Sequence, residues 1–219
     1  AVSGDGRYVY ASDFIGNEVV TLQAVNATCP VTPRSDCRQP VSSGAGLLEI
    51  RRKFGTTKGE SMIWRYDKGP FTTLSEFAND PLTTTDLALC LYDASAQSQP
   101  VLRAIIPAGN TCDVKPCWTR LLNELTPFRP RDEYNYRDRV GTPDGVRTLL
   151  LRPGLDGETR ITAKLVGTAD PQPTTFVAPG VTPPVRVQLL NSDPGGPCWE
   201  ATYSTPLVND ILNFKARPD

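Results

Sequence analysis

The chain has 219 residues, with 23 lysines and arginines against 24 aspartates and glutamates, six cysteines and no histidine. With a net charge of −1, the chain would gain little from counterion release on a phosphate backbone, so we expect no nucleic-acid partner. Its apolar runs are far shorter than the roughly 20 residues of a membrane-spanning helix, so we expect no membrane insertion. The lack of histidine excludes Ser-His and Cys-His nucleophile pairs and imidazole-ligated zinc.

Residues 1–25 alternate β-branched and aromatic side chains with polar ones, which predicts an N-terminal β-hairpin or strand extension. An isolated two-stranded hairpin is marginal in water, so this extension needs a partner. It either pairs with its own domain or is donated to another chain by β-augmentation. The side chains that would form the assembly strand are those of Tyr8, Val9, Tyr10, Val19, Val20 and Leu22.

Residues 26–45 are predicted to form a proline-rich linker. Pro30, Pro33 and Pro40 stiffen this segment around two cysteines, and we expect a Cys29–Cys37 disulfide to close it. Because the chain starts at Ala1 without a signal segment, we expect a processed form.

The cysteines are even in number and contain no C-x-x-C pair, so three disulfides are expected in place of a zinc or redox site; the alternative is a set of buried free thiols. They are Cys29, Cys37, Cys90, Cys112, Cys117 and Cys198. A Cys112–Cys117 bridge would leave Cys90 to pair with Cys198, although crossing these four differently fits nearly as well. Because disulfides persist in oxidising compartments, we predict a secreted, extracellular or cell-surface protein.

Residues 46–219 are predicted to form an all-β module, an antiparallel β-sandwich of short strands stabilised by disulfides. The evidence is a period-two alternation of apolar and polar residues between frequent prolines and glycines. The alternating segments are residues 48–54, 62–66, 87–92, 160–165, 185–189 and 199–203. The tryptophans in the most apolar segments, Trp64, Trp118 and Trp199, are expected to anchor the core.

Two short helical turns are expected inside this module. Residues 73–76 read Thr-Leu-Ser-Glu, which is a capping box, and the leucines of residues 121–125 predict a second turn. The Asp-Gly pairs at 5–6, 144–145 and 156–157 predict hairpin turns in preference to calcium loops.

Candidate catalytic groups are few. The chain has no G-x-S-x-G motif, and the carboxylates Asp132, Glu133 and Asp138, which could serve a glycosidase, lie among arginines that favour an ion-paired strand. We therefore predict a protein that is not an enzyme and that uses no cofactor and no metal.

A glycan partner is the other type of site considered. Tyr134 and Tyr136 fall on one side of an alternating strand, near Phe128 and Asn135, where they could stack on sugar rings. The competing interpretation is that this side faces the core.

Two stretches resemble known families. Residues 4–14 (GDGRYVYASDF) and 17–22 (NEVVTL) resemble a half-blade of the YVTN-type β-propeller repeat, without a second copy. From residue 47 to 219 the chain is similar to a β-rich module of secreted bacterial proteins, although residues 121–131 depart from its pattern with an apolar insertion. The motifs are MIWRY (62–66), LCLYD (89–93), TCDVKPCW (111–118), PDG (143–145) and CWEATYS (198–204). The resemblance implies secretion and a β-rich fold, but no activity.

These observations predict a secreted, non-enzymatic structural or surface-assembly protein that forms a homo-oligomer or filament by strand addition through residues 1–25. The alternative is a carbohydrate-binding or adhesive accessory module.

Overall fold

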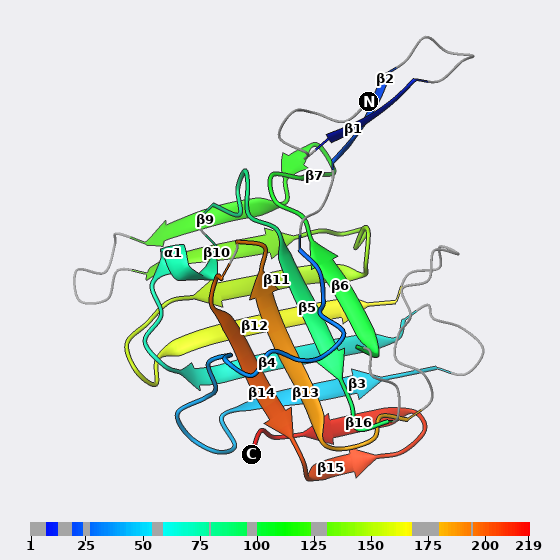
Figure 1. Ribbon diagram of the computed structural model, residues 1–219, viewed down its shortest axis with the longest axis vertical. Helices are drawn as coiled ribbons and strands as arrows, with labels where there is room; N and C mark the ends of the chain where they lie inside the picture. The colour runs from blue at the N-terminus through cyan, green and yellow to red at the C-terminus, as the bar shows by residue number, and fades with distance from the viewer. Residues whose placement is uncertain are drawn as a thin grey trace.

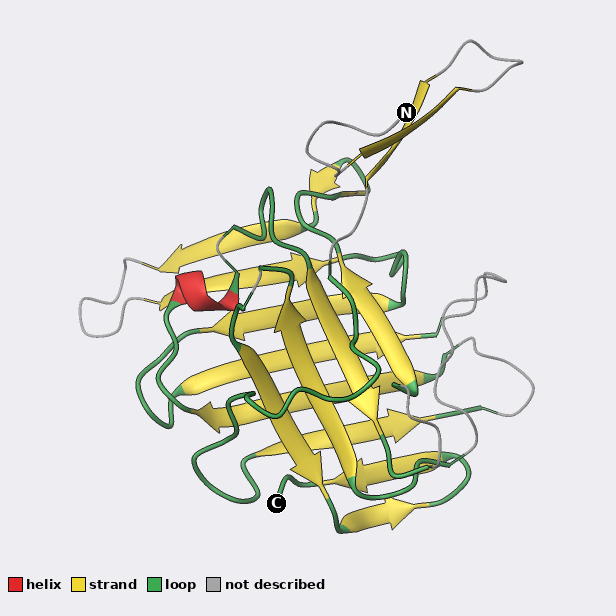
Figure 2. Cartoon of the chain, in the orientation of Figure 1, coloured by secondary structure: helices red, strands yellow, loops and turns green. Residues whose placement is uncertain are grey.

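The computed structural model describes residues 8–12, 19–23, 27–53, 59–78, 80–95, 100–123, 131–167, 180–193 and 195–219. They form two antiparallel sheets packed face to face, which confirms the predicted β-sandwich. The strands of the smaller sheet cross those of the larger one at a steep angle (Figure 1). Strands make up nearly all of the regular structure in the described part of the chain (Figure 2).

The larger sheet has eight strands and the smaller sheet has four. In spatial order, the eight-stranded sheet contains β15 (Pro206–Asn209), β16 (Asn213–Ala216), β3 (Gly46–Arg51), β4 (Ser61–Gly69), β12 (Thr159–Val166), β11 (Val146–Arg152), β10 (Arg131–Arg137) and β9 (Trp118–Asn123). The four-stranded sheet contains β14 (Cys198–Tyr203), β13 (Val185–Asn191), β5 (Leu87–Tyr92) and β6 (Leu102–Ile106). Two separate hairpins are formed by β1 (Tyr8–Ser12) with β2 (Val19–Gln23) and by β7 (Thr111–Cys112) with β8 (Lys115–Pro116).

The three tryptophans lie in the core between the sheets, as predicted. Each buried indole N–H finds an acceptor, which buried tryptophans normally need. Trp64 donates to the hydroxyl of Tyr203 across the sandwich (2.9 Å), Trp118 donates to the carbonyl of Pro107 (2.8 Å) and Trp199 donates to the hydroxyl of Thr72 (3.3 Å).

Residues 27–41, which we call the strap, cover the outer face of the four-stranded sheet. The outward residues of β5, including Cys90 and Tyr92, are buried in a second apolar cluster with Cys29 of the strap. The edge of β14 bonds to the strap as well, because Arg38 N–H donates to the carbonyl of Cys198 (2.8 Å). All six residues of β5 are therefore buried, on both faces of the strand.

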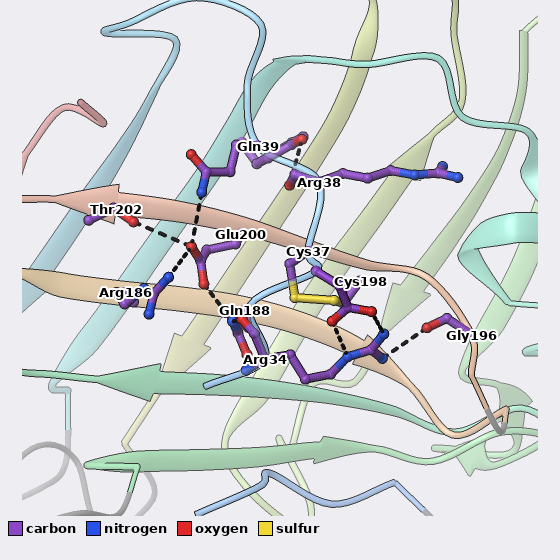
Figure 3. Close-up of a disulfide and its surroundings, with 12 residues drawn as sticks. Arg34, Cys37, Arg38, Gln39, Arg186, Gln188, Gly196, Cys198, Glu200 and Thr202 are labelled. Carbon is purple, nitrogen blue, oxygen red and sulfur yellow. Dashed lines mark hydrogen bonds and ion pairs between the residues drawn. A yellow bond between two sulfur atoms is a disulfide. The ribbon is translucent and has the colours of Figure 1, made fainter. Parts of the chain in front are cut away.

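The disulfides attach the strap to the sheet. One disulfide joins Cys29 to Cys90, and another joins Cys37 to Cys198, which is the bridge shown in Figure 3. The predicted Cys29–Cys37 and Cys90–Cys198 pairs are therefore wrong. The predicted Cys112–Cys117 pair is confirmed. Cys90 and Cys198 lie on β5 and β14, with β13 between them. Two strand spacings are about 10 Å, which is too far for a disulfide.

One of the two expected helical turns is present. Helix α1 (Leu74–Phe77) begins at Thr73, whose backbone N–H donates to the carboxylate of Glu76 (2.7 Å), so the capping box is confirmed. The turn expected at 121–125 is wrong, because residues up to Asn123 belong to β9 and pair with β10; residues 124–125 lie outside the described chain.

The described Asp-Gly pairs, at 144–145 and 156–157, lie in loops longer than two-residue turns. Gly145 and Gly157 have φ of 78° and 81°, a backbone conformation that favours glycine. The Asp5-Gly6 pair lies outside the described residues.

Candidate functional site

A groove of about 1000 Å³ lies on the outer face of the eight-stranded sheet, over β9, β10, β11 and β12. Its floor consists of side chains that point away from the core, and its walls include the β7–β8 hairpin and the loop that follows β10. The floor residues are Thr119, Leu121, Asn135, Arg137, Thr148, Leu150 and Thr162.

Strand register places four of these residues in one row. Thr119 lies opposite Asn135, Asn135 opposite Leu150, and Leu150 opposite Thr162. Because neighbouring strands are about 4.8 Å apart, the row spans about 14 Å, with a hydroxyl group at each end. Five of the seven floor residues are therefore polar, with an amide beside a leucine at the centre of the row, although more of the exposed lining surface is apolar than polar.

A β-bulge adds an arginine to the groove. The pairing register of β11 with β12 shifts between Val146 and Thr148. As a result, two successive residues, Arg147 and Thr148, are both partly exposed, whereas in a regular strand one of the two would be buried. A bulge of this kind redirects a side chain, and such bulges are frequent beside functional sites. Here it brings Arg147 to the same face as Arg137 and Thr148.

The acidic groups of the groove are largely occupied by the protein itself. Glu133 is buried and pairs with Arg152 (2.7 Å). Asp138 is also buried, and its carboxylate accepts backbone N–H bonds from Val140 (2.8 Å) and Thr142 (2.7 Å). Among the lining carboxylates, that of Asp113 is exposed and has no partner within the described residues.

The lining cations have no such partners. Within the described part of the chain, Lys115, Arg137, Arg139 and Arg147 form no ion pair. The lining carries four cations against three carboxylates, so the groove has a small local excess of positive charge, although the whole protein is almost neutral.

The β7–β8 hairpin forms a wall with an unusual tip. Asp113 and Val114 both have positive φ, 49° and 64°, and the Cys112–Cys117 disulfide closes the hairpin behind them. Positive φ is unfavourable for a β-branched residue, and strained backbone is concentrated at functional sites. Val114 is 94% exposed, so the strain holds an apolar side chain out in solvent.

Tyr134 and Tyr136 lie on the opposite face of β10. They are 5% and 0% exposed, and their rings pack against Trp118, with centroids 6.5 and 5.1 Å away. Burial raises the pKa of both hydroxyls. They therefore present no flat surface to a sugar, in agreement with the core interpretation, while the residues that alternate with them line the groove. Phe128 lies outside the described residues.

The residues named for the assembly strand fall on β1 and β2. Tyr8, Val9 and Tyr10 belong to β1, and Val19, Val20 and Leu22 belong to β2, with Val9 opposite Leu22. The two strands pair with each other as a hairpin, and the side chains of this hairpin lie outside the described part. In the described chain the hairpin is a sheet of its own and joins neither sheet of the sandwich.

The remaining candidates have structural roles. Asp132 pairs with Arg120, as an ion-paired strand requires. Asp36, Cys37 and Cys198 place three ligand atoms within 4.8 Å of one another, but the two sulfurs are joined in a disulfide and cannot act as thiolate ligands. All six cysteines are in disulfides, so the alternative of free thiols is wrong.

Comparisons of the chain with protein-family models, curated proteins and solved structures found no match. The resemblances to a secreted module and to a propeller repeat therefore stay predictions. No helix in the described residues is long and apolar enough to span a membrane.

Proposed function

We propose that this chain is a secreted, non-enzymatic structural subunit that assembles with copies of itself through the β1–β2 hairpin. The observation that supports this most strongly is that the hairpin pairs with neither sheet of the sandwich in the described chain. In Figure 2 it extends beyond the body of the molecule. A hairpin of this size is marginal in water, and pairing with a further strand would stabilise it.

The acceptor is the free edge of β9. This strand ends the eight-stranded sheet and has six residues, close to the five of β1 and of β2. Leu121 and Leu122 at this edge are 44% and 59% exposed, and the one charged residue of the strand, Arg120, is paired with Asp132 of β10. Natural edge strands usually carry free charge or proline to prevent pairing. The opposite edge, β15, is shorter and begins with Pro206, which has no N–H to donate.

The disulfides support the proposed extracellular compartment. Three disulfides fit a protein that works outside the reducing cytoplasm, and two of them hold the strap that covers the small sheet. Secretion is the simplest way for the chain to reach such an environment.

Light scattering on the full chain and on a variant without residues 1–25 tests the assembly. We expect oligomers of the full chain and monomers of the shortened one. Leu122→Lys should also give monomers, because a charge on the acceptor edge opposes pairing. Leu207→Lys on β15, where the leucine is 62% exposed, is the matched control and should leave the oligomers intact. An unchanged molar mass after removal of residues 1–25 would reject the proposal.

The groove favours a second function, that of a carbohydrate-binding or adhesive module. Tyr134 and Tyr136 do not serve it, because both are buried. The polar row from Thr119 to Thr162 takes their place, since hydroxyl and amide groups match the hydroxyls of a sugar chain. Glycan binding by the intact chain, measured on an array, tests this function.

A further inference from the structure

We propose that the groove on β9–β12 binds an acidic polysaccharide, a linear glycan that carries carboxylate or sulfate groups. This inference rests on the second function above and specifies the chemistry of its ligand. It rests on other observations than the assembly through β1–β2, although the acceptor strand β9 also contributes Thr119 and Leu121 to the groove floor.

The first step of the argument is the position of the cations. Arg137 ends β10 and lies opposite Thr148, while Arg147 occupies the bulge directly before Thr148. The backbone N–H of Asp138 donates to the carbonyl of Arg147 (3.0 Å), which ties the end of β10 to the bulge. Two arginines from different strands are thus held at the same end of the groove.

The loop between β10 and β11 leaves room for the Arg147 guanidinium. Gly141 has a φ of 77°, and a Cβ at this position would come within 3.2 Å of Arg147 Nε. A residue with a side chain would be strained by its backbone and would also crowd the guanidinium. The loop sequence therefore favours the observed placement of Arg147.

The second step is that the four cations of the lining outnumber its three carboxylates and have no ion-pair partner among the described residues. Glu133 is paired with Arg152, and Asp138 is occupied by backbone N–H groups. Arg137, Arg139 and Arg147 keep their guanidinium donors unpaired within the described residues. Guanidinium groups bind carboxylates and sulfates through paired, charge-assisted hydrogen bonds.

The third step is the character of the floor. The described lining residues include no aromatic side chain, so the groove does not offer the ring stacking on which neutral sugars rely. It offers hydroxyl and amide groups from Asn135, Thr148 and Thr162, whereas the Thr119 hydroxyl donates to the carbonyl of Asn135 (3.3 Å) and is left as an acceptor. Leu121 and Leu150 are the aliphatic side chains of this floor, so a peptide would find few hydrophobic anchors there, while a hydroxyl-rich anion would meet the arginines and the polar row.

The test uses immobilised full-length chain and four soluble polymers. Polygalacturonate carries carboxylates, dextran sulfate carries sulfates, dextran is neutral, and poly-glutamate is an acidic polypeptide. We expect one or both acidic polysaccharides to bind, with an affinity that falls as the salt concentration rises. Which of the two binds more tightly identifies the anionic group.

The variant R137Q/R147Q should weaken that binding by at least about tenfold, because two charge-assisted contacts are lost. The matched control R51Q/R217Q removes the same charge from exposed arginines outside the groove and should bind as the unmodified chain does. Lys115→Gln on the wall provides an independent variant with a smaller expected loss. Near-UV circular dichroism verifies that each variant is folded.

Four outcomes would overturn the inference. An equal loss in R51Q/R217Q would mean that binding reflects overall charge. Dextran binding that R137Q/R147Q does not change would preserve the second function but reject an anionic ligand. Binding of poly-glutamate alone would assign the groove to an acidic polypeptide. Failure of all three polysaccharides to bind would reject the glycan function together with this inference.

Discussion

The side chain of Gln188 on β13 donates a hydrogen bond to the buried carboxylate of Glu200 on β14, and the same amide bonds to the strap. Gln188 Nε2 also donates to the carbonyl of Arg34 (2.6 Å), and Gln188 Oε1 accepts from the N–H of Arg34 (3.1 Å). Arg186 supplies the charge partner of Glu200 (2.9 Å), as Figure 3 shows. One fully buried amide therefore connects the strap to an ion pair between the buried Glu200 and the partly exposed Arg186.

Gln188→Leu should destabilise the protein by about 2 to 4 kcal/mol, because it removes a donor from a buried carboxylate and leaves two backbone groups of Arg34 without partners. The free energy of unfolding in urea measures the effect. Gln39→Ala is the control, since exposed Gln39 gives Glu200 only a 3.3 Å hydrogen bond, and it should cost less than about 0.5 kcal/mol. Similar losses in both variants would contradict this account of the network.

The two classes of disulfide should differ in their contribution to stability. Cys37 and Cys198 are 161 residues apart, whereas Cys112 and Cys117 are 5 apart. In the chain-entropy description, replacing the long-range pair with alanines costs about 5 kcal/mol and replacing the short-range pair costs about 2 kcal/mol. Thermal unfolding of the two double variants measures the difference. Equal melting temperatures would show that closure of the long loop is not what stabilises the strap.

The cysteines also show where sequence analysis stops. An even number of cysteines without C-x-x-C spacing predicts three bridges correctly, and the short Cys112–Cys117 loop is one of the pairings that the sequence leaves open. The partner of Cys90 cannot be recognised from the sequence, because it depends on the placement of β13 between β5 and β14 and on the path of the strap across them. That order is a property of tertiary structure.

The groove shows the same division. Alternation along β10 places Tyr134 and Tyr136 on one face and leaves Glu133, Asn135 and Arg137 for the other, and the structure agrees. Predicting the row across the groove, by contrast, requires knowledge of the register of four strands, which the sequence does not contain. The bulge at Arg147 also interrupts the alternation on which strand predictions depend. The polar residues that alternate with the tyrosines, Glu133, Asn135 and Arg137, are the sequence signal that points to this face.

Stability should fall in acid as the Glu76 carboxylate is protonated. The hydrogen bond from the Arg38 guanidinium is the main cause that lowers the pKa of Glu76 from 4.5 to about 2. Because the folded pKa lies below the unfolded one, this stabilisation is complete above about pH 4.5 and is lost as the pH falls toward 2. Both side chains are partly exposed, so the contribution is about 1 kcal/mol.

Urea unfolding of the unmodified chain and of Glu76→Gln at pH 7 and pH 3 measures this contribution. The variant should be less stable at pH 7, and the difference should shrink at pH 3. Asp36→Asn is a suitable control because Asp36 pairs with Arg34 at the surface, where solvent screens the pair. A difference between Glu76→Gln and the unmodified chain that stays constant with pH would exclude the ion pair as its cause.

Val114→Gly should stabilise the protein by about 1 kcal/mol, since glycine adopts the φ of 64° at the hairpin tip without steric cost and the lost side chain contributes almost no burial. Val140→Gly is the control, because Val140 is also exposed (53%) but does not have positive φ. Glycine makes the unfolded chain more flexible without relieving strain here, so the melting temperature of this variant should be unchanged or lower. If Val114→Gly lowers the melting temperature as well, the valine contacts something that its exposure does not reveal. If it raises the melting temperature but weakens polymer binding in the groove, the strained tip is retained for function at the expense of stability.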